Sequence, residues 1–103
     1  MKNISDFKNE DAIDLIADLI EPVSRILQDE AIKEDITIKE KQMSAIKKAL
    51  KTHKSDILEI MARLEGVEVK DLNATPISLI GKCIQILNDK EMMDFLSSLA
   101  EEV

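Results

Sequence analysis

The stretch from Asp11 to Leu27 restricts the fold more than any other part of the chain. Its isoleucines are spaced by three and then four residues, and the apolar pattern continues beyond them (Ile13, Ile16, Ile20, Val23, Ile26 and Leu27). Apolar side chains at this spacing form a stripe along one side of an α-helix. The other side carries mainly acids, so the stretch predicts an amphipathic helix that covers an apolar surface.

The ends of this first helix follow from its flanking residues. It is expected to begin at Asn9 or Asp11, after a loosely ordered polar lead over residues 1–9, and to reach Glu21. Pro22 lacks a backbone N–H and crowds the preceding turn. A kink, or a new helix starting at Pro22, is therefore expected there.

Further helical stripes follow along the chain, and only two glycines and two prolines interrupt its 103 residues. Residues 28–38 are mixed and charged, which predicts a loop, with room for a helical turn within it. Four more helices are expected, each at a cap or stop signal: one after Thr37 with Glu40, one from Ser55 to Gly66, one opened by Thr75-Pro76, and one after Asn88 or Asp89. In the third of these the expected buried face is Leu79, Ile80, Cys83, Ile84 and Leu87. The sequence predicts an all-α fold, a single compact domain of five to six short helices spanning residues 1–103.

Charge is distributed unevenly along the chain. The formal net charge is −7, made up of −6 over residues 1–36, +5 over residues 37–54 and −6 over residues 55–103. Nucleic-acid affinity comes mostly from neutralising phosphates, so a net acidic chain is not expected to bind nucleic acid in general. The acid–base–acid order also leaves open whether the chain forms a homo-oligomer.

The single cysteine, Cys83, and the N-terminal residues indicate the cellular compartment of the protein. A single cysteine excludes an intrachain disulfide and favours a reducing compartment. The first residues lack the apolar run of a signal peptide, and no stretch is long and apolar enough to span a membrane. A cytoplasmic protein without a membrane partner is expected.

The chain offers few side chains suited to catalysis. His53 is the only histidine and has no carboxylate or thiol at a matched spacing, so we interpret it as an exposed linker residue. Cys83 lies on an apolar helix face and is interpreted as core. The first helix carries acids spaced by three or four residues (Asp11, Asp14, Asp18 and Glu21), which lack the glycine turn of a calcium loop. No catalytic, metal or cofactor site is expected, and the protein is predicted not to be an enzyme.

Lys47, Lys51 and Lys54 suggest a different class of function. They line up on one side if the helix continues that far, and a second helix follows, as in a helix-turn-helix. That second helix offers acids and aliphatic side chains where base-reading Arg, Asn or Gln would be needed. A small DNA-binding regulator is therefore the alternative reading.

The methionines allow two interpretations. Met43, Met61, Met92 and Met93 all lie in predicted apolar stripes. They form either an adaptable aliphatic core or part of a methionine-rich groove for a partner helix.

Four segments resemble the small tail assembly chaperones of long-tailed, siphovirus-type phages and prophages of Gram-positive bacteria. These segments are Phe7–Pro22, Ala45–Lys54, Leu58–Val67 and Pro76–Asp89. The similarity extends from Phe7 to about Leu99 and consists of ordering and composition, without a catalytic fingerprint.

The resemblance implies a non-enzymatic helical protein in the cytoplasm of the bacterial host cell. Its implied partner is the long hydrophobic tape-measure protein of the phage, with tail-tube subunits as a second class of partner, and no cofactor is implied. A chaperone of this kind needs adaptable apolar surface together with enough charge to remain soluble. We expect that surface on the first helix (Ile13, Ile16 and Ile20) or on the last (Met92, Phe95 and Leu96).

Overall fold

Helix α1 runs without interruption from Asn9 to Leu27 and contains Pro22 in its interior. The computed structural model describes residues 3–102. The expected helix end at Glu21 and new start at Pro22 are therefore wrong. A proline inside a helix costs about 3 kcal/mol, but here both sides of Pro22 are anchored in the core by Leu19 and Val23. Tertiary packing outweighs the local penalty.

Helix α2, Glu30–Ile36, occupies the segment that the sequence predicted to be a loop. The Asp29 carboxylate accepts a hydrogen bond from the backbone N–H of Ala31 at 3.2 Å and so caps the helix. Ile32 and Ile36, one turn apart, are both buried. A short helix with one cap and two apolar residues is too small to show a clear periodic pattern in sequence.

Helices α3, Gln42–Thr52, and α4, Lys54–Glu65, are separated by His53 alone. The backbone N–H of His53 donates to the Ala49 carbonyl, and the His53 carbonyl accepts from Ile57. Thr37 and Ser55 are not the N-caps that the sequence predicted, because a short 3-10 turn over Lys39–Lys41 precedes α3 and α4 begins before Ser55. At the other end of α4, the expected stop is confirmed: Gly66 has a left-handed φ of 74°.

Helices α5, Pro76–Leu87, and α6, Lys90–Glu102, begin as expected. Thr75 and Ser78 exchange side-chain and backbone hydrogen bonds at the start of α5, at 2.9 and 3.3 Å. The Asp89 carboxylate accepts from the backbone N–H of Glu91 at 3.0 Å. Both starts use local side-chain caps, which sequence reveals directly.

The segment expected to be a loose lead is attached to the domain from Asn3 onward. Residues Ile4–Asp6 form a 3-10 turn, and Ile4 is buried in the core. The Gln85 side-chain amide donates to the side-chain oxygen Oδ1 of Asn3 at 2.7 Å, and both the N–H and the hydroxyl of Ser5 donate to the Asp89 carboxylate at 3.3 Å. Met1 and Lys2 lie outside the described residues. The lead thus links the beginning of the chain to the junction of α5 and α6.

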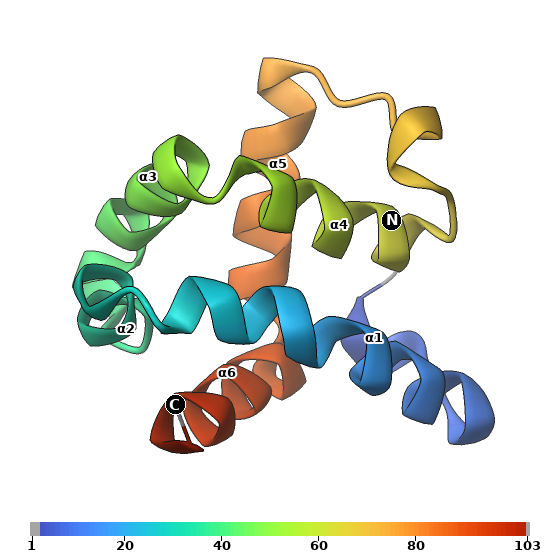
Figure 1. Cartoon of the computed structure of the whole chain (residues 1–103), viewed down its shortest axis with the longest axis horizontal. Coiled ribbons are helices and arrows are strands. Elements are labelled where there is room, and N and C mark those ends of the chain that lie inside the picture. Colours follow the sequence, from blue (N-terminus) through green and yellow to red (C-terminus); the bar gives the residue numbers. More distant parts are fainter. Residues whose placement is uncertain (1–2, 103) are drawn as a thin grey trace.

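The six helices enclose an aliphatic core. Figure 1 shows α4 above α1 and α6 below it. Helix α2 lies beside α3, and α5 crosses behind α4. A short 3-10 turn, Val69–Asp71, lies between α4 and α5. The largest fully buried side chains are Leu15, Leu19, Leu27, Ile32, Met61, Leu64 and Met92. No strand occurs within residues 3–102, so the predicted all-α fold of a single domain is confirmed.

Candidate interaction surfaces

The outer face of α1 leaves two isoleucines in solvent. Ile13 is 70% exposed and Ile20 is 43% exposed, whereas Ile16 is half-buried against the core. Over the same part of the helix, the core side is formed by Leu15 and Leu19, which are fully buried. The apolar arc of α1 is therefore wider than the core needs, and part of it remains available to a partner.

Acidic side chains flank this exposed part of α1. Asp14 and Glu21 are exposed beside the isoleucines. Asp18 forms an ion pair with Arg63 of α4. We name the surface formed by Ile13, Ile16 and Ile20 the α1 stripe. Its composition suits an apolar helix that carries basic residues beside its apolar face.

The last helix does not present the surface expected of it. Met92 is 2% exposed and Leu96 is 9% exposed, and both belong to the core. Phe95 is half-buried and packs against the same core. Of the six residues predicted to bind a partner, only those of the α1 stripe include side chains that are largely in solvent.

The methionines do not form a continuous groove. Met61 and Met92 are core, Met93 is half-buried, and Met43 is 54% exposed. Met93 packs against the core cluster, so the core interpretation applies to three of the four side chains. Met43 is an isolated surface residue on α3.

Charged side chains connect α1 to α4. Arg25 donates from Nε to Asp56 at 2.7 Å and from Nη2 to Glu59 at 3.0 Å, and the hydrogen bond to Asp56 raises the pKa of the Arg25 guanidinium. His53 lies between two carboxylates, with Nε2 at 3.3 Å from Asp29 and Nδ1 at 3.5 Å from Asp56. His53 does lie at the junction of two helices, as expected, but the expectation that it is exposed is wrong, since its side chain is only 19% exposed. It links the α1–α2 turn to the α3–α4 junction.

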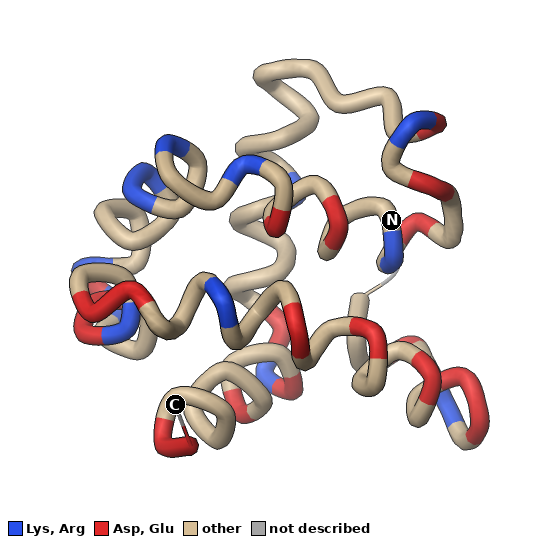
Figure 2. The backbone as a smooth tube through the Cα atoms, viewed as in Figure 1, with Lys and Arg blue, Asp and Glu red and all other residues tan. Residues whose placement is uncertain are grey.

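The basic face predicted on the α3 side is present. Lys47, Lys51 and Lys54 are exposed, and among the described residues none of them forms an ion pair. The neighbouring Lys48 instead contacts Asp35 of α2 at 2.9 Å, and its ammonium group lowers the pKa of that carboxyl. Figure 2 shows the lysines gathered on α3 and at the start of α4. Lys54 belongs to the second helix, so the three lysines do not follow one continuous helix.

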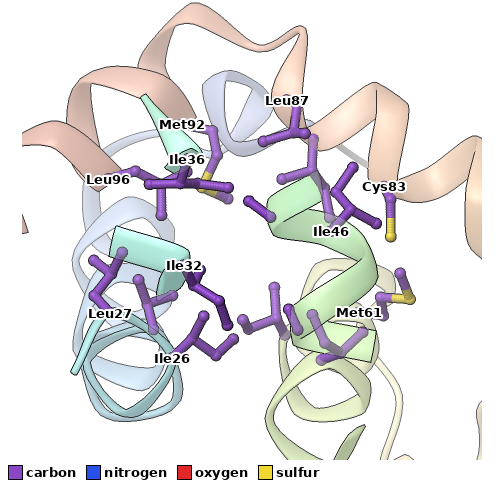
Figure 3. A pocket seen from close by; sticks show the side chains of 16 residues that line it. Ile26, Leu27, Ile32, Ile36, Ile46, Met61, Cys83, Leu87, Met92 and Leu96 are labelled. Atoms are coloured by element: carbon purple, nitrogen blue, oxygen red, sulfur yellow. The ribbon is translucent and has the colours of Figure 1, made fainter. Parts of the chain in front are cut away.

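An apolar cavity of about 90 Å³ lies at the centre of the domain. All six helices contribute to its wall, including Leu27 of α1, Ile46 of α3, Met61 of α4 and Cys83 of α5. Figure 3 shows these side chains directed toward a common space. Its wall of carbon and sulfur atoms offers a ligand apolar contacts and no hydrogen-bond partners.

Cys83 is buried in a small cluster with Ile46 and Met61, which confirms its interpretation as core. Burial raises the pKa of its thiol, because the charged thiolate is poorly solvated there. We expect Ellman's reagent to label Cys83 at least roughly 100-fold more slowly in the native protein than in the urea-unfolded chain, since labelling requires both opening and ionisation. Equal rates for the two states would contradict this placement.

Helix α5 carries an exposed apolar surface that the sequence analysis assigned to the core. Ile77 is 81% exposed, Ile84 is 44% exposed and Ile80 is 36% exposed, whereas Cys83 is the buried residue of this helix. The expected burial of Ile80 and Ile84 is therefore wrong. The width of the apolar arc could have indicated this exposure in the sequence, because a helix on the surface of a domain needs only one narrow apolar stripe to pack on the core.

The described residues contain no group of three or more His, Cys, Asp or Glu side chains that could hold a metal ion. Between Asn3 and Glu102, no helix is long and apolar enough to cross a lipid bilayer. No known protein-family model, no characterised protein and no solved structure matches this chain significantly.

Proposed function

We propose that this protein is a non-enzymatic tail assembly chaperone that binds apolar helical segments of a phage tape-measure protein in the bacterial cytoplasm. The observation that carries the proposal is the α1 stripe, which leaves Ile13 and Ile20 in solvent between acidic side chains. Large apolar side chains in a row on a small protein are typical of a protein-binding site. The resemblance of the four segments to tail assembly chaperones supplies the identity of the client.

The charge of the protein supports a chaperone role for the same stripe. A bound apolar client adds hydrophobic surface to the complex, and a net charge of −7 opposes aggregation of that complex. The acids beside the stripe also favour client helices that carry lysine or arginine. Binding thus combines an apolar contact with electrostatic selection.

Co-expression tests the proposal. The chain is produced together with the tape-measure protein encoded by a neighbouring gene, and the soluble fraction is purified by a tag on the small protein. We expect the tape-measure protein to be insoluble alone and to co-purify when this chain is present. A tape-measure protein that remains insoluble, or that is equally soluble without this chain, would exclude the proposal.

The second candidate function is DNA binding through Lys47, Lys51 and Lys54. These exposed lysines favour it, but beyond Lys54 the exposed positions of α4 hold Ser55 and Glu59, where base-reading Arg, Asn or Gln would be needed. Fluorescence anisotropy with a labelled duplex distinguishes the two functions. A DNA-binding regulator would bind with an affinity that falls steeply with salt and with Lys51→Glu, whereas a chaperone would leave the anisotropy unchanged.

A further inference from the structure

Helix α5 is apolar over a wider arc than its own packing uses. Its inner side contributes Cys83, Leu79 and Leu87 to the small cluster beneath it. Its outer side presents Ile77, Ile80 and Ile84, spaced by three and four residues. A helix that is apolar on both its inner and outer sides is normally covered on both. The outer side, which we name the α5 face, therefore has the character of an interface.

Gly81 lies in the middle of the α5 face, and nothing in its own chain explains it. A Cβ at this position would meet no atom within 4 Å, and its φ does not lie in the left-handed region. Glycine in a helix interior costs roughly 0.5–1 kcal/mol relative to alanine. A glycine on an exposed apolar face allows the backbone of another helix to approach closely, as at small-residue helix crossings.

Charge identifies the occupant of this face. Helix α5 contains no acid, and its single charged residue, Lys82, is paired with Glu65. Figure 2 shows the loop before α5 and the beginning of α5 without charged residues. Two copies of a chain with a net charge of −7 repel each other wherever their acids meet, as they would if two α1 stripes came together. Helix α5 brings no acid of its own into such a contact, so two copies meet there with less repulsion than two α1 stripes would.

We infer that the α5 face binds the same face of a second copy of this chain. The two α5 helices cross at Gly81, with the isoleucines of each copy packed beside the glycine of the other. Such an interface is isologous, so it closes at a twofold dimer. One helix per copy provides less than the roughly 1,200 Å² typical of stable complexes, and we expect a dissociation constant in the micromolar range. The dimer leaves the α1 stripe of each copy to its client, and it does not depend on the proposed function.

Sedimentation velocity of the full chain, from about 5 to 500 µM so as to span a micromolar equilibrium, tests the inference. We expect a monomer–dimer equilibrium whose dissociation constant in 0.5 M NaCl is about the same as at low salt, because salt does not screen apolar contacts. Gly81→Glu should weaken dimerisation by at least about tenfold, since it brings two carboxylates together at the crossing. Circular dichroism should show this variant folded, because the position is open and glutamate favours a helix more than glycine does.

One further variant serves as a matched control for sedimentation, and another tests the α5 face at a second position. Ser97→Glu adds the same charge to an exposed position of α6 and should leave the dimer unchanged. Ile77→Asp removes the most exposed isoleucine of the α5 face and should also give a monomer.

Three results would overturn the inference. The first is a wild-type chain that is monomeric at the highest concentration, and the second is a dimer whose dissociation constant is unchanged by Gly81→Glu. The third is an assembly that grows beyond dimers and dissociates in salt, because that behaviour would indicate head-to-tail contact between the basic α3 side and the acidic α1 side.

Discussion

Replacing Leu19 by alanine should lower the free energy of unfolding by about 3 kcal/mol, within the range measured for buried leucines. Leu19 is fully buried and lies on the core side of α1. Its removal loses apolar burial and leaves a space that the neighbouring helices cannot fill, because α1 is fixed to α4 through Arg25 and Asp56. Urea unfolding followed by circular dichroism measures the change.

Ile20→Ala is the matched control for this measurement, one position further along the same helix. Ile20 is 43% exposed, so its truncation should lower the free energy of unfolding by less than about 1 kcal/mol. Comparable losses for Leu19→Ala and Ile20→Ala would mean that α1 is rotated relative to the core. In that case the α1 stripe would be core and unavailable to a client.

Replacing Ile13 and Ile20 together by aspartate should weaken client binding by at least about 100-fold. Burial of a fully exposed isoleucine contributes roughly 1.5–3 kcal/mol, and Ile13 and Ile20 are 70% and 43% exposed, so together they contribute about 2 kcal/mol to the interface. Burying the carboxylates that replace them costs at least about 1 kcal/mol more, and a total of about 3 kcal/mol corresponds to this factor. Neither side chain belongs to the buried core of the free protein, so the variant should keep its fold, with a modestly lower thermal midpoint because Ile20 is partly buried. Titration of a soluble, labelled tape-measure segment measures the affinity.

The control for this variant is Ile38→Asp combined with Met43→Asp. Both positions are exposed apolar residues outside α1, and the double substitution adds the same two negative charges. It should leave client affinity within about twofold of the wild type, since exposed sites away from an interface contribute little. An equal loss in both variants would assign the effect to net charge. Unchanged affinity in the Ile13 and Ile20 variant would remove the α1 stripe from the binding site.

Sequence reasoning succeeded where a local signal decides the structure. The capping pair of Thr75 and Ser78, the Asp89 cap and the left-handed Gly66 are all set by residues a few positions apart. The helical class followed from the periodic apolar spacing and the scarcity of glycine and proline. These features depend little on the rest of the fold.

Sequence reasoning failed where tertiary packing outweighs local preference. Pro22 was expected to end a helix, but the core on both sides of it keeps α1 continuous. Helix α2 was missed because it is stabilised by burial of its two isoleucines against α3, and the residues of α2 alone do not reveal this packing. The contact between His53 and Asp29 could not be predicted, because the two residues lie 24 positions apart in sequence.

The candidate surfaces show the same division. A wide apolar arc reveals in sequence that a helix has excess apolar surface, but it does not reveal which edge of the arc faces the core. On α1, Leu15 and Leu19 are buried in the core and Ile13 is exposed. On α5, Cys83 is buried and Ile77 and Ile84 are exposed. On α6 the core took Met92 and Leu96, which had been expected to meet a partner. Only the arrangement of all six helices determines these choices.

Isoleucine-methyl NMR of the protein with a soluble apolar segment of the tape-measure protein tests the central claim most directly. The account predicts that the methyl signals of Ile13 and Ile20 shift or broaden in proportion to the added segment, while those of the buried Ile32 and Ile36 stay in place. A spectrum that does not respond to any such segment would contradict the chaperone function. A response confined to other isoleucines would contradict the α1 stripe as the binding surface.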